Sequence, residues 1–180
     1  MATESTTVRK RPGMAAKSVR DMVLSLIAVM LAGFGIYLFI PHSGGNGVRA
    51  VSWQDSVPSA RRAAPYPLLA PAGDPKGWTA TSVRYDGEHD HTWSLGFIDD
   101  KGQYAAVQQA TGPLADVVKN ATVDAVKQSA VTTVDGVAWT HYQGSRYRAL
   151  VRQTPQGTSV VFGTESFARL ADFVALLRSS

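Results

Sequence analysis

WTATSVRYDGEHDHTWSLGFI, residues 78 to 98, is the stretch that decides the fold. Its two ends, 78–85 and 91–98, are rich in β-branched and aromatic residues, a composition typical of strands. Three large apolar residues of the second end occupy alternate positions and so share one face of a strand: Trp93, Leu95 and Phe97. The polar DGEHD between the two ends has the composition of a turn. The stretch therefore predicts a β-hairpin with one apolar face.

The same patterns continue toward the C-terminus. They predict, in order, a strand at 104–110, a helix at 111–126, strands within 131–142 broken or bulged at Asp135-Gly136, a hairpin of 146–153 and 158–164, and a helix at 166–177. The order βββ-α-βββ-α indicates an α+β domain, in which helices cover one face of an antiparallel sheet.

Toward the N-terminus, residues 22–40 (MVLSLIAVMLAGFGIYLFI) are apolar and carry no charge. As a helix, such a segment spans about 28 Å, close to the hydrocarbon thickness of a bilayer. A buried soluble helix would have a polar face, and a cleaved signal peptide would have a shorter apolar region followed closely by a cleavage site. An uncleaved transmembrane helix is the interpretation that the segment favours.

Charge around this segment predicts its orientation. Residues 1–21 carry five basic and two acidic residues, whereas Arg49 is the one basic residue among the twenty that follow the segment. Because positive flanks stay in the cytoplasm, we expect a cytoplasmic basic tail at 1–21 and a single-pass protein of the cell membrane. A Pro/Gly-rich linker and arm at 41–77 would then lead to an extracytoplasmic domain at 78–180.

Composition narrows the function classes. The chain has no cysteine, which excludes disulfides, thiolate metal sites and a cysteine nucleophile. The excess of basic residues lies outside the predicted domain. Residues 78–180 contain nine Lys/Arg and ten Asp/Glu, and this near-neutral balance disfavours nucleic-acid binding by the domain. No P-loop, dinucleotide fingerprint or nucleophile motif is present, so no cofactor and no catalytic residue are predicted, although a site assembled in space stays open.

EHDHTW (88–93) raises the question of a metal site. On an extended chain His89 and His91 point to the same side and are the candidate metal ligands. Zinc sites need three or four protein ligands, and a third would have to come from elsewhere in the chain. The competing interpretation is a hairpin turn exposed to solvent. Charged residues are favoured in such a turn because their side chains stay hydrated.

The second candidate site is a basic stripe. Arg146, Arg148 and Arg152 recur at period two, so they would line one face of a strand, and His141 could lie nearby across a hairpin. Such a stripe could hold an anionic ligand or an acidic partner. The alternative is the solvated face of a half-buried sheet.

Several short motifs carry a family resemblance: PKGW (75–78), WSLGF (93–97), YAAVQQ (104–109), DGVAW (135–139) and GTSVVFGTESFARL (157–170). With the basic tail and the apolar segment, the chain resembles an actinobacterial family of single-pass membrane proteins, domain of unknown function 4245. The resemblance covers residues 20–178 and implies membrane anchorage and an extracytoplasmic domain. It implies no catalytic residues.

The sequence thus leads to a membrane-anchored binding or interaction module of the cell envelope. Its expected partners are the lipid bilayer and an envelope component, whether glycan, lipid or protein. An envelope enzyme of hydrolase type and a structural accessory subunit of a membrane complex are the alternatives. A pocket with converging polar groups would favour the enzyme, and an exposed apolar patch would favour a protein partner.

Overall fold

The computed structural model describes residues 22–31 and 50–179, which belong to two compact units, Met1–Gly44 and Gly45–Ser180. Residues 22–31 form a helix with exposed apolar side chains. Within these described ranges, no helix is both long and apolar enough to cross a bilayer. The predicted span 22–40 continues into residues 32–40 which, like the predicted tail 1–21, lie outside the described ranges. The span therefore stays a prediction.

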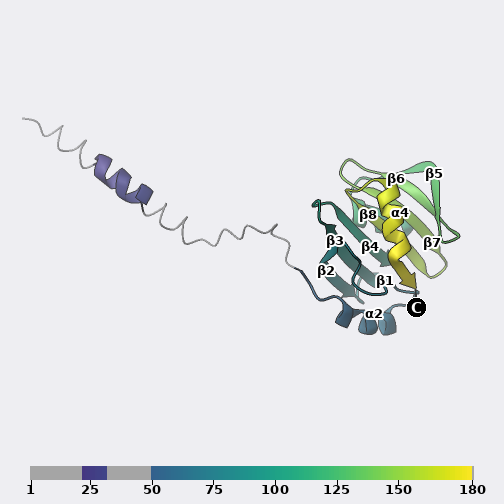
Figure 1. The fold of residues 1–180 in the computed structure, drawn as a ribbon. Helices are drawn as coiled ribbons and strands as arrows, with labels where there is room; N and C mark the ends of the chain where they lie inside the picture. Colours follow the sequence, from purple (N-terminus) through teal and green to yellow (C-terminus); the bar gives the residue numbers. More distant parts are fainter. Residues whose placement is uncertain (1–21, 32–49, 180) are drawn as a thin grey trace, which may run out of the picture. The chain divides into compact units, whose positions relative to one another are not determined.

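The second unit carries the strands and the remaining helices (Figure 1). In chain order its elements are η1 (Gln54–Ser56), α2 (Val57–Ala63), β1 (Leu69–Pro71), β2 (Trp78–Asp86), β3 (Thr92–Asp99), β4 (Tyr104–Ala110), α3 (Leu114–Thr122), β5 (Val126–Val134), β6 (Val137–Gln143), β7 (Arg148–Thr154), β8 (Gly157–Gly163), α4 (Phe167–Leu176) and β9 (Leu177–Ser179).

Seven strands form one antiparallel sheet in the order β2-β3-β4-β8-β7-β6-β5, and β1 pairs with β9 in a separate ribbon. The predicted α+β class with an antiparallel sheet is confirmed. The predicted order βββ-α-βββ-α is wrong, because four strands lie between α3 and α4 and because β1 and β9 flank the series. The extra strand comes from Asp135-Gly136, where we expected a break or bulge.

These two residues form a two-residue hairpin turn between β5 and β6. Both have positive φ, 48° at Asp135 and 77° at Gly136, and Val134 pairs directly with Val137. Two positive φ values define the turn whose twist matches that of the flanking strands, and Asp-Gly is among its preferred sequences. Asp135 of this turn also lines a groove.

The predicted helix 111–126 also ends early. Val123 has φ 72° and ψ −56°, and the N–H of Asp124 donates to the carbonyl of Thr122 at 3.0 Å. This three-residue turn is rare and strained, and it is unusual for a β-branched residue. It stops α3 at Thr122, and β5 begins a few residues later.

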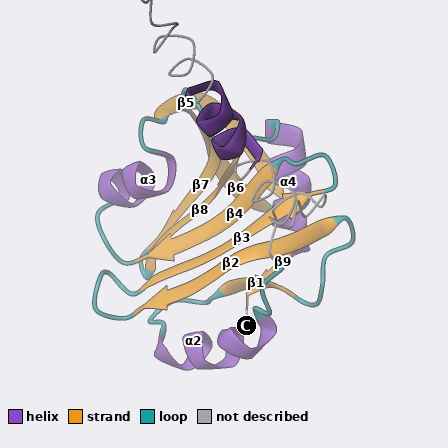
Figure 2. Ribbon diagram, turned by 90° about the vertical axis from the view of Figure 1, so that its left-hand side faces the viewer, coloured by secondary structure: helices purple, strands orange, loops and turns teal. Residues whose placement is uncertain are grey.

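Helices cover both faces of the sheet, so the prediction that they cover one face is wrong (Figure 2). Leu170 and Phe173 of α4 pack with Val107 and Val161, whereas α3 packs against the opposite side. The central strands β4, β7 and β8 each contain at least three consecutive buried residues. Burial on both sides replaces the alternating pattern expected of a sheet with one wet face.

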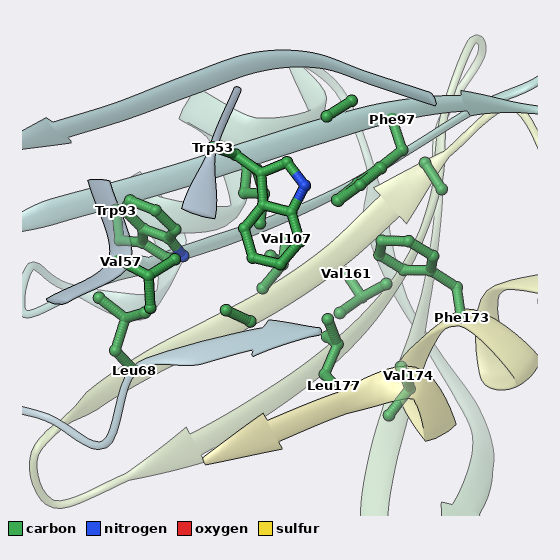
Figure 3. Close-up of a cluster of buried hydrophobic side chains, with 14 of the residues drawn as sticks. Trp53, Val57, Leu68, Trp93, Phe97, Val107, Val161, Phe173, Val174 and Leu177 are labelled. Atoms are coloured by element: carbon green, nitrogen blue, oxygen red, sulfur yellow. The ribbon is translucent and has the colours of Figure 1, made fainter. Parts of the chain in front are cut away.

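The larger core lies between the sheet and α4, and the segment before β2 supplies part of it (Figure 3). Trp53 meets Phe97 edge-on with ring centroids 6.1 Å apart, and Phe97 meets Phe173 at 5.5 Å. Leu68 is fully buried in the same cluster. The predicted arm therefore contributes to the core rather than only lying over it.

Both outer strands of the seven-stranded sheet are irregular. The register of β2 against β3 shifts between Ala80 and Ser82, and that of β5 against β6 shifts between Lys127 and Val131. The inner pairings run without a shift.

Candidate functional site

A groove of about 250 Å³ lies between the β1–β9 ribbon and the β5–β6 hairpin. Six of its ten lining residues are apolar: Leu69, Val134, Val137, Trp139, Val174 and Leu177. Three charged residues also line it, namely Asp135, Arg152 and Arg178. This combination of apolar walls and a few polar groups is typical of small-molecule sites.

A second hollow of about 120 Å³ adjoins the groove. The two share Leu69, Arg152 and Ser179. Side chains of Gln109, Thr154, Gln156 and Ser159 contribute polar groups to the second hollow. Arg152 therefore lines both hollows.

Arg152 is placed there by strand register. It lies on β7 opposite Ser159 of β8, on the same face as the fully buried Leu150, which α4 covers. Its side chain is half-buried, and it makes no hydrogen bond or ion pair with any other residue in 22–31 or 50–179. A partly desolvated guanidinium without a partner gains free energy when an anion binds it.

Trp139 supplies a second polar group without a partner. It is 2% exposed, and its indole N–H is buried with no acceptor among the described residues. Most buried polar atoms in proteins are hydrogen-bonded, and leaving one unpaired costs about 1–3 kcal/mol. The nitrogen itself is enclosed by protein atoms, so Trp139 lines the groove with other atoms of its side chain.

Arg178 differs from Arg152 because it already has partners. Its Nη1 donates to the carbonyls of Ala175 at 2.7 Å and Leu177 at 2.8 Å. The same atom lies 3.9 Å from the carboxylate of Asp135. Asp135 therefore offsets the charge of Arg178, and Arg152 is the cation of the groove whose charge no described residue offsets.

The ribbon that bounds the groove is held by two buried side chains of the sheet. Gln109 accepts a hydrogen bond from the N–H of Leu69 at 2.6 Å and donates to the carbonyl of Pro67 at 3.1 Å and to Ser159 at 3.0 Å. The indole N–H of Trp93 donates to the carbonyl of Leu69 at 3.1 Å. The two side chains thus satisfy backbone groups of β1 that an adjacent strand would otherwise bind.

The comparisons with known proteins give a family. Residues 15–177 match the family model described as "Protein of unknown function (DUF4245)". The chain belongs to the DUF4245 family. No curated protein and no solved structure matches it.

In this DUF4245 chain the predicted basic stripe is divided. Arg146 precedes β7 and lies over the ring of Tyr147, 5.1 Å from its centroid. Arg148 donates to the carbonyls of Thr164 and Glu165 and so joins the start of α4 to the sheet. The groove contains one residue of the stripe, Arg152.

His141 is also separate from the groove. Its ring stacks on Phe167 with centroids 4.0 Å apart, and its Nε2 lies 2.7 Å from the hydroxyl of Thr132. Leu150 lies directly opposite it on β7. His141 therefore packs under the first turn of α4.

The two other candidate histidines lie in the β2–β3 turn and have different partners. His89 Nδ1 contacts the carboxylate of Asp86, and this hydrogen bond is the main reason that the pKa of Asp86 lies below its usual value. His91 Nδ1 lies 3.0 Å from the hydroxyl of Tyr85. Across the described ranges, no three side chains of the metal-binding types gather closely enough to hold an ion.

Sequence reasoning missed three contributors to the groove: Asp135, Trp139 and Arg178. A signal existed for Trp139, because it faces the same side of the sheet as Arg152 once the register of β6 against β7 is known. No local pattern brings Arg178 to the groove, since the pairing of β9 with β1 joins segments more than a hundred residues apart.

Proposed function

We propose that the second unit is a ligand-binding domain whose groove takes an anionic ligand at Arg152. The observation that carries the proposal is Arg152, a half-buried residue of the groove whose guanidinium has no counter-charge among the described residues. Arg178, the other cation of the groove, already contacts Asp135 and two backbone carbonyls. A guanidinium without a counter-charge suits an oxyanion.

Binding fits the groove better than catalysis does. The hydroxyl of Ser159 accepts a hydrogen bond from Gln109 rather than contacting a histidine or carboxylate that could activate it. None of the groove's lining residues is a histidine, and its one carboxylate, Asp135, neighbours Arg178. A nucleophile needs an adjacent base, and these contacts do not supply one.

We further propose that the domain is anchored in the cell membrane by residues 22–40 and faces the outside of the cytoplasm. The uncharged apolar sequence, the exposed apolar side chains of residues 22–31 and the basic residues before them support this placement. The ligand would then be a component of the cell envelope.

Orientation has its own test. Alkaline phosphatase and a fluorescent protein that folds in the cytoplasm would be fused to the C-terminus in separate chains. We expect phosphatase activity without fluorescence. Fluorescence without phosphatase activity would contradict the proposed orientation.

Ligand binding is tested with the full chain in nanodiscs of zwitterionic lipid. The four tryptophans would be labelled with 5-fluorotryptophan, and the Trp139 resonance identified by its loss in Trp139→Phe. Hexanoate, hexyl phosphate and neutral hexanol serve as probes. We expect at least one of the two anions to shift the Trp139 resonance at concentrations at which hexanol does not.

Two arginine variants form a matched pair for this experiment. Arg152→Gln removes the groove cation, whereas Arg146→Gln removes a cation that lies on Tyr147 outside the groove. The anion-induced shift should disappear in the first variant and persist in the second. An unchanged shift in Arg152→Gln, or none with either anion in the unmodified chain, would refute the proposal.

A further inference from the structure

The charge balance of the groove limits the charge of its ligand. Arg152 and Arg178 bring two positive charges, and Asp135 brings one negative charge 3.9 Å from Arg178. One positive charge therefore remains for the ligand. A dianion would leave a surplus negative charge close to Asp135, whose carboxylate would repel it.

The shape of the groove indicates what accompanies that charge. Five of its ten lining residues are aliphatic, and its volume of about 250 Å³ is below the range of about 300–1,000 Å³ usual for drug-sized ligands. A short, branched aliphatic group would bury apolar surface against them. Arg152 lines the same groove, and a planar guanidinium can bind both oxygens of a carboxylate.

We infer that the ligand is a monocarboxylate whose charged group lies next to a short aliphatic group. The Arg152 guanidinium pairs with the carboxylate, and the apolar side chains of Leu69, Val137 and Val174 contact the aliphatic part. The inference rests on the proposed function and adds the class of ligand to it. Both a free acid and the C-terminal residue of a peptide present this chemistry.

The inference is tested with the labelled full chain in the same nanodiscs. The probes are 4-methylpentanoate, 3-methylbutyl phosphate, 4-methylpentanol and acetate. We expect 4-methylpentanoate to bind at least about tenfold more tightly than 4-methylpentanol and acetate, because ion pairing and burial of the alkyl group each contribute 1.4 kcal/mol or more. It should also bind more tightly than 3-methylbutyl phosphate, whose second negative charge is not balanced in the groove. N-acetyl-alanyl-leucine, compared with 4-methylpentanoate, distinguishes a peptide C-terminus from a free acid.

Asp135→Asn sharpens the test. Asparagine is at least as favourable as aspartate in this turn, so the variant changes charge while preserving the hairpin. Without the Asp135 carboxylate the groove has two uncompensated cations. The preference for 4-methylpentanoate over 3-methylbutyl phosphate should then decrease or reverse, whereas Asp74→Asn, a carboxylate outside the groove, should leave it unchanged.

The outcomes separate the inference from the proposed function. Tighter binding of the phosphate than of the acid by the unmodified chain would overturn the inference and leave anion binding at Arg152 intact. Equal affinities for acetate and 4-methylpentanoate would also overturn it. No shift of the Trp139 resonance with any anion would reject both. A preference that is the same in Asp135→Asn would contradict the charge balance on which the inference depends.

Discussion

The two faces of the seven-stranded sheet are packed in different ways. On the α4 face the core contains large rings from separate parts of the chain: Trp53, Trp93, Phe97, Trp139 and Phe173. On the α3 face the core is made largely of small residues: Ala106, Ala110, Val117, Val118, Ala121, Ala149, Val151 and Val160, with Tyr142 and Phe162. The corner next to α3 also exposes three valines, Val123, Val126 and Val131.

The groove lies on the face of the sheet that several separate elements cover. The α4 face is covered by several elements, including η1, α2, the β1–β9 ribbon and α4, and the groove lies where the ribbon and α4 meet the β5–β6 hairpin. The α3 face is covered by one short helix that ends in a strained turn. We expect the α4 face to dominate stability and the α3 corner to tolerate change.

Removing a large ring should affect the α4 face most. Phe97→Ala deletes a fully buried ring that contacts Trp53 and Phe173, and we expect it to lower the free energy of unfolding by about 3–5 kcal/mol. Val117→Ala on the α3 face should cost about 1.5 kcal/mol, since it removes two methyl carbons. Urea unfolding followed by tryptophan fluorescence measures both, because all four tryptophans lie in the second unit. Equal losses would contradict the comparison.

Breaking the bonds of Gln109 to the ribbon should have the next largest effect. Gln109→Met keeps the side-chain length but leaves the N–H of Leu69 without its acceptor, and we expect a loss of about 2–3 kcal/mol. Trypsin should then cleave after Arg61 and Arg62 in α2 more rapidly, because the segment is less firmly held. Gln108→Met is the matched control, since Gln108 makes no side-chain hydrogen bond within the described residues. Similar cleavage rates in the two variants would show that Gln109 does not hold the segment.

The α4 face also has a pH-dependent contact. Burial alone would raise the pKa of Asp99, but the backbone N–H groups of Gln103 and Lys101, with other polar contacts, outweigh it and hold the pKa below its usual value. A lowered pKa in the folded state stabilises the protein above the unfolded pKa of about 4, and this stability is lost as the pH falls through the folded pKa.

We therefore expect Asp99→Asn to lower stability at pH 7 and to lessen the loss of stability between pH 5 and pH 3. Urea unfolding at pH 7, 5 and 3 measures this. An equal difference between the variant and the unmodified chain at all three pH values would mean that the charge of Asp99 does not matter.

The smallest effect is expected at the α3 corner. Val123 is 74% exposed and adopts a positive φ that a β-branched residue disfavours. Val123→Gly should raise the free energy of unfolding by about 1 kcal/mol, because relief of backbone strain exceeds the added entropy of the unfolded chain. Leu176→Gly, at an exposed position on α4, is the contrasting change and should destabilise the protein. A loss of stability in Val123→Gly would show that the valine side chain is needed at this corner.

Much of the fold could be predicted from local pattern. The strands near 78–86, 92–99 and 104–110 and the helix at 167–176 follow from alternation, from 3.6-residue periodicity and from Ser166, whose side chain accepts a hydrogen bond from the N–H of Arg169. Helices on both faces were harder to predict, because runs such as Ala149-Leu150-Val151 do not reveal which face each residue occupies. The extra strand was missed because Asp-Gly is also compatible with a bulge.

The groove was less predictable than the fold. Arg152 was found because a cation in a half-buried strand is visible in the sequence. Its neighbours Trp139 and Arg178 come from β6 and β9, and only the register of the strands brings them together. The same pattern of basic residues on a predicted strand also pointed to Arg146, Arg148 and His141. In the structure these three contact neighbouring residues outside the groove.

The irregular outer strands have a consequence for how copies of the protein behave near one another. A sheet ends in rows of unpaired backbone groups, and a regular outer strand is a template on which another chain can extend the sheet into an aggregate. In this molecule the register shifts at Ala80/Ser82 and Lys127/Val131 interrupt both rows. Lys127 adds a charge to the β5 row, which also exposes Val126 and Val131. The shifts therefore oppose extension of the sheet by a second copy at either edge.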